Sequence, residues 1–230
     1  MLPTPVTDSL KFPEFVDVYS PAEDSFLFLD ALEKDIHFIR TFVNPALSIE
    51  VGSGSGIIST FLSKIINQMC SFICIDISPQ ACMASKSVFS ENSSRYPLDS
   101  VCADLLSTVR QTPGGLADIL LFNPPYVPTD SSELASAKSS LTAAWAGGNH
   151  GREVIDRFIR QFAPIIAKSG VLYLLLVREN KPDEVIKLIS DSSNGRFSKA
   201  ICVLQRRCRN EHLYVYRFFD PSFYPHYDKD

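Results

Sequence analysis

The stretch Glu50-Val51-Gly52-Ser53-Gly54-Ser55-Gly56 lies between a short apolar run that ends at Val51 and a helical pattern that begins at Ile57. Glycines let the main chain turn sharply and let a ligand approach the backbone closely. The helix that follows presents free N–H groups in its first turn. A strand, a glycine-rich loop and a helix in this order place a ligand at the carboxyl end of a parallel sheet. The stretch therefore predicts an α/β fold with a ligand site beside the loop.

The rest of the chain alternates between short β-rich segments and helical patterns. The strand candidates are Ala46–Val51, Phe72–Ile75, Ser100–Ala103, Ile119–Phe122, Gly170–Val177, Ala200–Leu204 and Leu213–Phe219, of which Ser100–Ala103 is the weakest. The helical candidates are Ile57–Met69, Gln80–Ser90, Glu153–Ala167 and Asp183–Ser190. This alternation predicts a Rossmann-like, doubly wound, seven-stranded and mostly parallel sheet with helices on both faces. Only about Gln205–Asn210 separates the last two strands, so we expect them to form an antiparallel hairpin.

A further helix is expected before the first strand. Ser20 is typical of an N-cap, Pro21 of a first helical position and Glu23 of the returning residue in a capping box. Apolar residues then recur at helical spacing, at Phe28, Leu29, Leu32, Ile36 and Ile39. Pro124–Gly151 is the longest stretch without a clear element, and a loop of this length in a compact domain is usually functional or disordered.

The composition is that of a globular protein with a modest negative charge. Of the 230 residues 45% are hydrophobic and 21% are charged, which excludes a mainly disordered chain. Lys and Arg number 22 and Asp and Glu 26, so the net charge of −4 provides no diffuse basic field for non-specific duplex binding. No apolar run reaches the ~20 residues of a membrane span, and Met1–Lys11 has no apolar signal-peptide core. The six cysteines form no Cys-x-x-Cys pair and the four histidines are scattered, so we expect no metal site.

The residues around the glycine loop favour a cationic ligand. A dinucleotide fingerprint Gly-x-Gly-x-x-Gly that starts at Gly52 would need a third glycine at position 57, which is Ile57. Acidic residues end three strand candidates instead: Glu50, Asp76 and Asp104. Repeated acids disfavour a pyrophosphate and suit a sulfonium ligand that also carries an ammonium group. Asp76, 24 residues after Gly52, is placed to accept hydrogen bonds from two ribose hydroxyls.

Asn123-Pro124-Pro125-Tyr126 follows the strand candidate Ile119–Phe122, which should lie next to the first strand and beside the predicted ligand. The prolines stiffen the backbone and supply carbonyls without competing N–H groups. The Asn123 side-chain oxygen and a following carbonyl are two acceptors, which match the two N–H donors of a planar amide or amino group. Tyr126 offers a ring face to a flat substrate group.

With these residues in place, the chain resembles the class I S-adenosylmethionine-dependent methyltransferases, and within them the HemK-like glutamine methyltransferases that modify peptide release factors. The matching blocks are Val18–Ser25, Glu50–Gly56, Asp76, Asp104-Leu105, Asn123–Tyr126, Ala144–Gly148 and Gly151–Glu153. The last two blocks and the short N-terminal segment resemble the eukaryotic and archaeal branch, because bacterial members carry an additional N-terminal helical domain. The Asn-Pro-Pro-Tyr motif alone is shared with adenine-N6 methyltransferases, so the resemblance depends on the other blocks. Val127–Leu141 matches less clearly.

The resemblance implies S-adenosylmethionine as the cofactor and S-adenosylhomocysteine as the product. The implied cofactor-binding residues are Tyr19, Ser25, Glu50, Gly52, Gly54, Gly56, Asp76, Ile77, Asp104, Leu105 and Asn123. Asp76 would bind the ribose, Asp104 with Leu105 the adenine. Glu50 and Gly52 would bind the methionine part, and Tyr19 or Ser25 would cover the cofactor. The implied catalytic residues are Asn123, Pro124, Pro125 and Tyr126, with the Asn123 side chain and the Pro124 carbonyl holding a glutamine amide.

The implied substrate is the glutamine of the Gly-Gly-Gln loop in the eukaryotic class 1 release factor, methylated at N5. The implied partner is a small zinc-binding activator protein that forms a heterodimer through a sheet edge, expected near Val101–Ala103. We expect a single methyltransferase domain over residues 1–230, with an extension (1–17), an N-terminal helix that covers the cofactor site (18–45) and a catalytic core (46–230). We expect the protein in the cytoplasm, and also in the nucleus, without contact to membranes or direct contact to nucleic acid.

Two other functions are open on the sequence. Adenine-N6 methylation of nucleic acid would use the same tetrapeptide, with Tyr126 stacked on a flipped base. The negative net charge is unfavourable for this function, and the cluster Arg206, Arg207 and Arg209 is more simply a solvated hairpin turn. A non-catalytic scaffold subunit would not need the glycine loop or Asn123.

Overall fold

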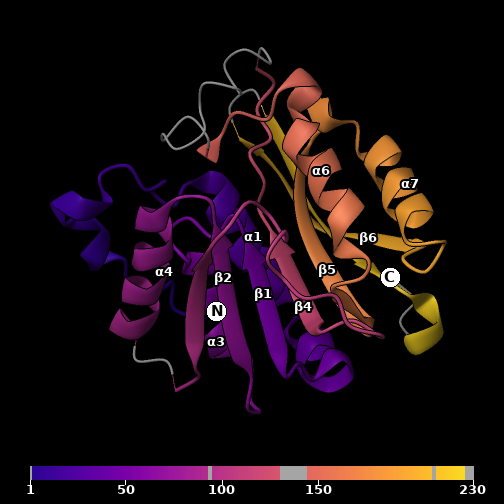
Figure 1. Cartoon of the computed structure of the whole chain (residues 1–230), viewed down its shortest axis with the longest axis horizontal. Coiled ribbons are helices and arrows are strands. Elements are labelled where there is room, and N and C mark those ends of the chain that lie inside the picture. The colour runs from indigo at the N-terminus through magenta and orange to yellow at the C-terminus, as the bar shows by residue number, and fades with distance from the viewer. Residues whose placement is uncertain (1, 93–94, 130–143, 209–210, 226–230) are drawn as a thin grey trace.

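The computed structural model describes residues 2–92, 95–129, 144–208 and 211–225, and these form a seven-stranded sheet with the strand order β3-β2-β1-β4-β5-β7-β6 (Figure 1). The strands are β1 (Leu47–Val51), β2 (Ser71–Asp76), β3 (Leu98–Cys102), β4 (Ala117–Phe122), β5 (Ile166–Val177), β6 (Lys199–Cys208) and β7 (Glu211–Phe219). The first five strands in chain order are parallel, and β7 is antiparallel to both of its neighbours. The predicted mostly parallel sheet is confirmed, including its weak third strand and its terminal hairpin.

The chain reverses its direction of travel through the sheet between β1 and β4. It proceeds from β1 outward to β2 and β3, and then returns to β4 on the other side of β1. In open α/β sheets, ligands bind in the crevice outside the carboxyl ends of the strands at such a reversal. The carboxyl ends of β1 and β4 are Val51 and Phe122, which are paired in register. The glycine loop and the Asn-Pro-Pro-Tyr motif therefore begin side by side.

Helices cover both faces of the sheet (Figure 1). They are α1 (Glu23–Lys34), α2 (Ile36–Phe38), α3 (Ile57–Ile65), α4 (Pro79–Glu91), α6 (Glu153–Phe162) and α7 (Pro182–Ser192). Short turns of 3₁₀ or π type are η1 (Asp8–Lys11), η2 (Pro13–Phe15), η3 (Ile39–Val43), η5 (Asn149–Gly151), η6 (Arg178–Asn180) and η7 (Pro221–Phe223). None of the helices in the described ranges is long and apolar enough to cross a membrane.

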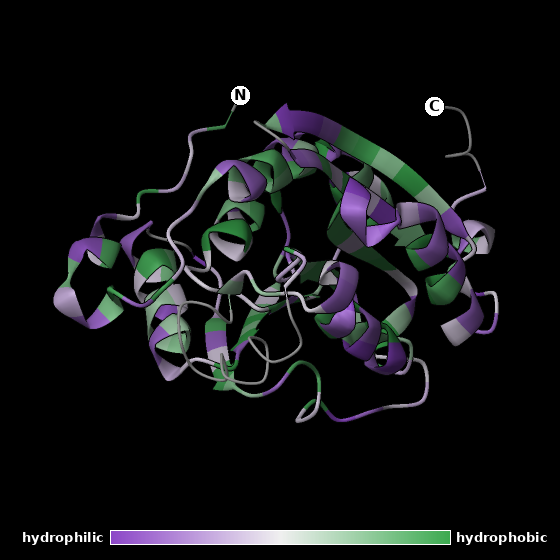
Figure 2. Cartoon of the chain, turned by 90° about the horizontal axis from the view of Figure 1, so that it is seen from above, coloured by the Kyte–Doolittle hydropathy of each residue, from purple (hydrophilic) through white to green (hydrophobic). Residues whose placement is uncertain are grey.

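Each face of the sheet has its own hydrophobic core. One core joins α1, α3 and α4 to the sheet, and Phe89 of α4 packs at a tilt against Phe72 of β2 with ring centroids 5.3 Å apart. The other core joins α6 and α7 to the opposite face, where Phe158 of α6 packs on Phe122 of β4 at 4.5 Å. Viewed from above, the helices carry hydrophobic and hydrophilic bands around the sheet (Figure 2). Phe122, the last residue before the Asn-Pro-Pro-Tyr motif, is thus held by a packed core.

The first helix begins later than the sequence predicted. Ala22, in extended conformation, is the N-cap, and the helix starts at Glu23. Ser20 is therefore not the N-cap and Pro21 is not a helical residue, so the predicted capping box is wrong. The cap is reversed instead: the Ser25 hydroxyl accepts a hydrogen bond from the Ala22 N–H at 3.4 Å. This later start directs the first helical turn toward the carboxyl end of the sheet.

Three predicted boundaries also change. The helix predicted for Glu153–Ala167 ends at Phe162, because Pro164 has no N–H for a further helical turn and the chain enters β5 at Ile166. The helix predicted from Ile57 ends at Ile65 instead of Met69. The predicted turn at Gln205–Asn210 is shorter, because β6 continues to Cys208, while residues 209 and 210 lie outside the described ranges.

The N-terminal segment lies along α4 before it reaches the carboxyl end of the sheet. The Val6 N–H donates to the Asn92 side chain at 2.9 Å, and the Ser9 hydroxyl donates to the Glu91 carboxylate at 2.9 Å. Phe15 and Val18 then pack on Ala84 of α4. These contacts place Tyr19, which follows Val18, at the carboxyl end of the sheet.

A buried ion pair connects the first helical region to β7. Arg217 is 1% exposed and its guanidinium donates to the Asp35 carboxylate at 2.5 Å. The Tyr173 hydroxyl donates to the same carboxylate oxygen at 2.9 Å, and the guanidinium lies 3.7 Å above the Phe38 ring. Burial and the Asp35 charge raise the pKa of Tyr173 well above its usual range, so the hydroxyl remains a donor. The cluster lies among core residues of the face covered by α1.

Candidate active site

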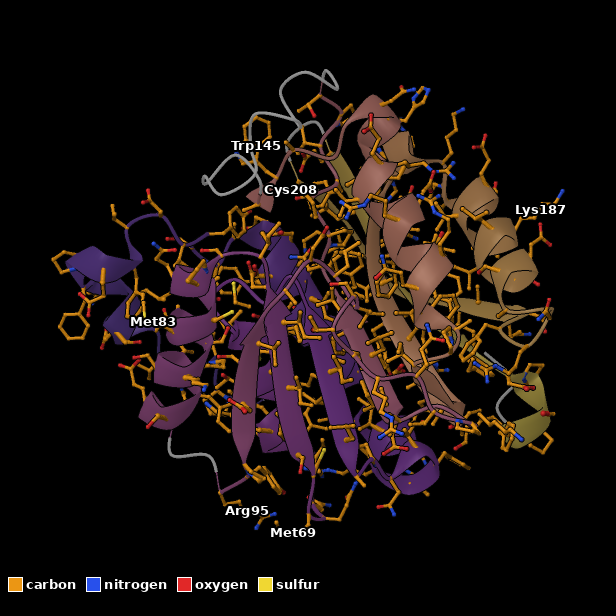
Figure 3. All side chains as sticks on the ribbon, viewed as in Figure 1. Met69, Met83, Arg95, Trp145, Lys187 and Cys208 are labelled. Atoms are coloured by element: carbon orange, nitrogen blue, oxygen red, sulfur yellow. The ribbon has the colours of Figure 1, made fainter. Side chains whose placement is uncertain are left out.

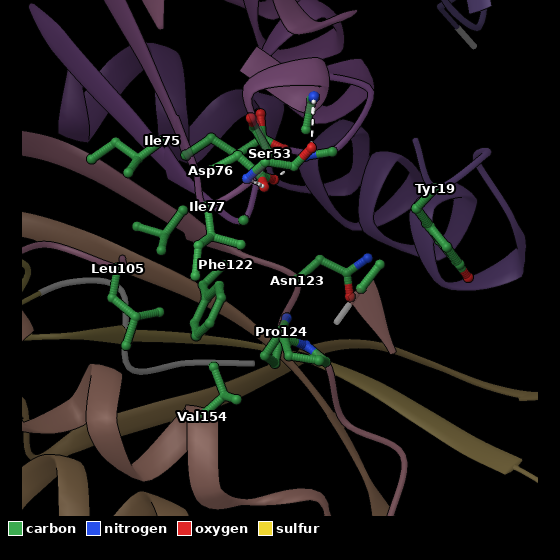
Figure 4. A pocket seen from close by; sticks show the side chains of 18 of the residues that line it. Tyr19, Ser53, Ile75, Asp76, Ile77, Leu105, Phe122, Asn123, Pro124 and Val154 are labelled. Carbon is green, nitrogen blue, oxygen red and sulfur yellow. Dashed lines mark hydrogen bonds between the residues drawn. The ribbon is translucent and has the colours of Figure 1, made fainter. Parts of the chain in front are cut away.

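A cavity of about 550 Å³ opens at the carboxyl ends of β1, β2 and β4 (Figure 4). The predicted site residues that line it are Tyr19, Ser25, Glu50, Gly52, Gly54, Asp76, Ile77, Asp104, Leu105, Asn123, Pro124 and Pro125. Two predicted residues, Gly56 and Tyr126, do not line it. The structure therefore brings most of the residues chosen from the sequence into one cavity.

Gly56 has a clear structural role at the start of α3. It caps α3 with a positive φ of 74°, and a Cβ at this position would lie 2.7 Å from the Ser85 Cα atom of α4. A side chain here would thus force α3 and α4 apart. The structure thus shows that Gly56 allows close packing of the two helices, and its contact with the cofactor stays a prediction.

Asp76 holds the glycine loop and the start of α4 from the end of β2. One carboxylate oxygen accepts from the Gly54 N–H at 2.9 Å, and the other accepts from the Ser78 N–H at 2.9 Å. Burial raises the pKa of Asp76, while these two hydrogen bonds lower it. Each oxygen retains a second lone pair, so the side chain can still accept from ribose hydroxyls. Its role in ribose binding stays a prediction.

Glu50 is a carboxylate buried at the end of β1. It is 1% exposed and accepts a hydrogen bond from the Ser59 N–H at 2.9 Å. Burial raises the pKa of Glu50 to about 7, and the nearby Asp76 charge adds to the rise. A cationic ligand in the cavity would lower this pKa again, because the opposite charge favours the ionised carboxylate. Glu50 is therefore suited to hold an ammonium group.

This pKa predicts a pH-dependent affinity for S-adenosylmethionine. Because Glu50 with a pKa of about 7 changes from mostly protonated to mostly ionised between pH 6 and pH 8, the Kd should fall by about tenfold over this range. Isothermal titration calorimetry of the wild type and of Glu50→Gln tests this. The Glu50→Gln variant should bind more weakly, with no change over the same range. A wild-type Kd that is constant from pH 6 to 8 would contradict the assignment of Glu50.

The far end of the cavity is suited to a flat apolar group beside one acid. Ile77, Leu105 and Val154 lie around this end (Figure 4). Asp104 is ion-paired with Arg157 of α6, so its carboxylate is already engaged. An adenine amino group would therefore share Asp104 with Arg157, a residue that the sequence did not indicate. The adenine contact of Asp104 and Leu105 stays a prediction.

Asn123 presents a free acceptor at the opposite end of the cavity. Its side-chain nitrogen donates to the Asp24 carboxylate at 2.9 Å, which fixes the orientation of the amide group. Its Oδ1 atom is buried and receives no hydrogen bond from the described residues. Buried polar atoms are nearly always hydrogen-bonded, so an orphaned acceptor at the edge of a cavity indicates a missing donor. No described residue donates to the Pro124 carbonyl either.

Asp24 is a functional residue that the sequence analysis did not single out, although it lies within the block Val18–Ser25. It is 4% exposed in the first turn of α1 and accepts from Asn123, from the Tyr19 hydroxyl at 3.4 Å and from the Ser25 hydroxyl at 3.3 Å. Burial raises the pKa of Tyr19, and the Asp24 charge raises it further. The sequence offered one indication of this role: Asp24 is an acidic residue that lies on the same, buried side of the helix as the core residue Leu27.

Tyr126 lines a second, neighbouring hollow of about 460 Å³. Its walls are Tyr19, Ala22, Glu23, Asp24, Tyr126, Cys208, Glu211 and Leu213. Tyr19 and Asp24 belong to both cavities, so the two spaces adjoin at the Asn123 end. The stacking of Tyr126 on a substrate group stays a prediction, at the entrance side of the site.

The arginine cluster differs from the solvated turn that the sequence suggested. Arg206 and Arg207 belong to β6, and Arg209 lies outside the described ranges. Arg206 pairs with Asp30 of α1 at 2.5 Å and with Glu23 at 3.7 Å. Because these carboxylates partly neutralise Arg206, the cluster gives little support to nucleic-acid binding.

The residues present fit S-adenosylmethionine. The buried carboxylate of Glu50 and the half-buried carboxylate of Asp76 suit a ligand with cationic groups and a ribose, and an apolar end suits adenine. The orphaned oxygen of Asn123, a residue that lines the same cavity, is available to an acceptor substrate. The cavity thus has a suitable group for the ammonium, the ribose and the adenine of the cofactor.

Comparison with known proteins agrees with this chemistry, although no protein-family model matches the chain. The chain is 37% identical to "Methyltransferase HEMK2" of Mus musculus over 94% of its own length and 96% of that protein. It is 40% identical to "eRF1 methyltransferase catalytic subunit mtq2" of Schizosaccharomyces pombe over 82% and 85% of the two chains. In structure, it is similar to the E. cuniculi Mtq2–Trm112 complex that methylates the eRF1 translation termination factor, with a TM-score of 0.61, 27% identity and coverage of 89% and 99%. By these identities over nearly full-length chains, and by a cavity built for a cationic methyl donor, this chain belongs to the HEMK2/Mtq2 family of S-adenosylmethionine-dependent methyltransferases.

Proposed function

We propose that this chain transfers a methyl group from S-adenosylmethionine to the side-chain amide nitrogen, N5, of the glutamine in the Gly-Gly-Gln loop of the class 1 release factor eRF1. The observation that carries the proposal is the Asn123 side chain, whose nitrogen is held by Asp24 and whose buried oxygen is free to accept a hydrogen bond. The names of the relatives, eRF1 methyltransferase among them, support the choice of substrate.

The acceptor pair matches a primary carboxamide. A glutamine amide has two N–H donors in one plane, and the Asn123 oxygen and the Pro124 carbonyl are two acceptors at short spacing. Accepting both hydrogens draws electron density onto the amide nitrogen and directs it. Because Pro124 and Pro125 have no N–H groups, no neighbouring donor competes for these acceptors.

Methyl transfer here depends on positioning and electrostatics. The bound cofactor supplies an electrophilic methyl group on a positively charged sulfur. Glu50 and Asp76 would hold the cationic and ribose parts, and Asn123 with Pro124 would hold and orient the amide nitrogen. Alignment of reacting atoms at ~3–3.5 Å supplies several kcal/mol of barrier reduction. The N–CH₃ bond would form as the S–CH₃ bond breaks, and the acidic amide proton would pass to water during or after transfer, so no strong base is required.

We also propose a Trm112-like activator as the partner, bound to the β3 edge of the sheet, and the zinc-binding character of that activator is part of this proposal. β3 is an outermost strand, and unpaired edge strands are a liability in an isolated protein. Apolar side chains are exposed around it, at Val101 of β3, Ile77 after β2 and Met83 of α4. Met83 lies on α4 near this edge in Figure 3. The Mtq2–Trm112 complex provides a precedent for such a heterodimer.

A charge introduced on this edge should weaken the heterodimer. We expect poor solubility of the chain expressed alone and recovery of solubility on co-expression with the activator.

Val101→Asp should weaken the complex by roughly tenfold or more, because it places a charge in an apolar interface. Leu116→Asp, an exposed leucine beside β4 at the other end of the strands, is the matched control and should not change the affinity. Equal affinities for both variants would refute a β3 interface.

The proposed activity is tested by transfer of a labelled methyl group. The heterodimer should label wild-type eRF1 and should not label a variant in which the loop glutamine is replaced by alanine. Mass spectrometry should place one added methyl group on that glutamine. Labelling of the variant at the wild-type level would contradict the proposed acceptor. Transfer to DNA or RNA with a steep salt dependence would favour adenine-N6 methylation instead.

A further inference from the structure

Three segments of the chain meet at the side chain of Asn180. This residue ends η6, directly after β5, and is completely buried. Its nitrogen donates to the carbonyl oxygens of Tyr126 at 3.0 Å, His150 at 2.9 Å and Gly151 at 3.3 Å. Its oxygen accepts from the Val177 N–H at 2.9 Å. One amide group therefore joins the end of β5, the Asn-Pro-Pro-Tyr motif and the loop before α6.

The partners determine the orientation of this amide. The two hydrogens of the nitrogen are shared among three carbonyl oxygens, and the Val177 N–H requires an acceptor, so the nitrogen and the oxygen cannot be exchanged. Asparagine is the side chain that supplies both at this length. Aspartate would keep the acceptor for Val177 and would place an oxygen against three carbonyls.

The contact to Tyr126 anchors the catalytic tetrapeptide. Pro124 and Pro125 have no N–H groups, so the first backbone anchor that follows Asn123 is the carbonyl of Tyr126. The next residue, Val127, donates to the Trp145 carbonyl at 3.0 Å and accepts from the Gly147 N–H at 2.8 Å. On the other side of Asn123, Phe122 is paired with Val51 in the sheet. The two acceptors, the Asn123 oxygen and the Pro124 carbonyl, therefore lie between two fixed points: the end of β4 and the hydrogen bond from Asn180 to Tyr126.

The loop before α6 and the Asn-Pro-Pro-Tyr motif are packed too closely for additional side-chain atoms between them. A Cβ on Gly151, which has a φ of 66°, would collide with the Tyr126 carbonyl. A Cβ on Gly147 would lie 2.7 Å from the Pro125 carbonyl. The backbones of the motif and of the loop before α6 are therefore in direct contact. Asn180 donates hydrogen bonds to both of these backbones. A displacement of Asn180 should move the tetrapeptide as well, because the Asn180 side chain contacts the Tyr126 carbonyl directly.

We infer that Asn180 is a positioning residue for the proposed methyl transfer: by holding the Tyr126 carbonyl, it sets where the Asn123 oxygen and the Pro124 carbonyl meet the acceptor amide. Asn180 does not line the cofactor cavity, so we expect its larger effect on the acceptor side. The inference rests on the proposed function, because it concerns the rate of that reaction.

The experiment compares Asn180→Asp with the wild type in the heterodimer with the activator. The kcat for methyl transfer to eRF1 should fall roughly 10- to 100-fold, since a displacement of about 1 Å at the reacting atoms costs about this much. The Kd for S-adenosylmethionine should stay within threefold. Rates are expressed per cofactor-binding site, so unfolded protein does not contribute. Gly151→Ala, which displaces the same carbonyl from the other side, should also reduce kcat with little change in cofactor Kd.

Ser193→Ala is the matched control. Ser193 is also buried and polar, and its hydroxyl accepts from Phe197 and donates to Ile189 near the end of α7, outside the cavity. Its loss should lower the stability without changing kcat per binding site. The inference is overturned if Asn180→Asp keeps kcat within threefold, or if it loses cofactor binding together with activity. Absence of transfer by the wild type would overturn the proposed function as well, whereas an active wild type with an equally active Asn180→Asp overturns this inference alone.

Discussion

Asn123→Ala should reduce kcat for methylation of eRF1 by at least about 10²- to 10³-fold, the effect typical of losing one electrostatic contact at a reacting group. The variant removes the free, buried Oδ1 acceptor and also leaves the Asp24 carboxylate without its 2.9 Å donor. The cofactor Kd should remain within a few-fold, because Glu50 and Asp76 are unchanged at the other end of the cavity. Single-turnover transfer with saturating cofactor measures the first quantity, and calorimetry measures the second.

A control for this variant is Asn67→Ala, which removes an exposed asparagine at the opposite end of the sheet and should leave both quantities unchanged. Asp24→Asn supplies an intermediate case. It keeps a hydrogen-bonding group beside Asn123 and removes the charge that orients it, so kcat should fall less than in Asn123→Ala. Equal losses of cofactor affinity and of kcat in Asn123→Ala would make this asparagine a structural residue and would contradict its role as the acceptor.

Asp35→Ala should lower the free energy of unfolding by about 3–5 kcal/mol, because it removes one side of the buried ion pair between Asp35 and Arg217. It also removes the acceptor of the Tyr173 hydroxyl. Urea denaturation followed by circular dichroism measures the loss. Asp30→Ala, which breaks the partly exposed pair with Arg206, should cost only about 0–1 kcal/mol.

The double variant Asp35→Leu/Arg217→Met separates charge from packing at this cluster. Replacing both charged groups with apolar ones removes the buried guanidinium together with the carboxylate, so the double variant should be more stable than Asp35→Ala. A loss in Asp35→Ala no larger than that in Asp30→Ala would show that the buried pair contributes no more than a surface pair.

The sheet and the acidic end of the site could be predicted from the sequence because both depend on local patterns. Apolar runs identified every strand, and acids that end consecutive parallel strands must meet at one edge, which brought Glu50 and Asp76 into the same cavity. β3 was the weakest prediction because most of its residues are exposed, so its apolar alternation is poor.

The acceptor side of the site depends on contacts that no local pattern reveals. Asp24 meets Asn123 across 99 positions of sequence, and Asn180 meets Tyr126 across 54. Both are single polar residues that look like ordinary helix or turn positions. Their importance follows from the distant carbonyl or amide that each one holds. The start of α1 was missed for a related reason, since Ser20 has the chemistry of an N-cap and the extended Ala22 occupies the position.

A crystal structure of the chain with S-adenosylhomocysteine bound would decide whether the cavity at the end of β1, β2 and β4 is the methyl-donor site. The ammonium group should lie beside Glu50, the ribose hydroxyls on Asp76, and the sulfur should face the free oxygen of Asn123. An empty cavity, or a ligand whose sulfur points away from Asn123, would contradict the proposed methyl transfer.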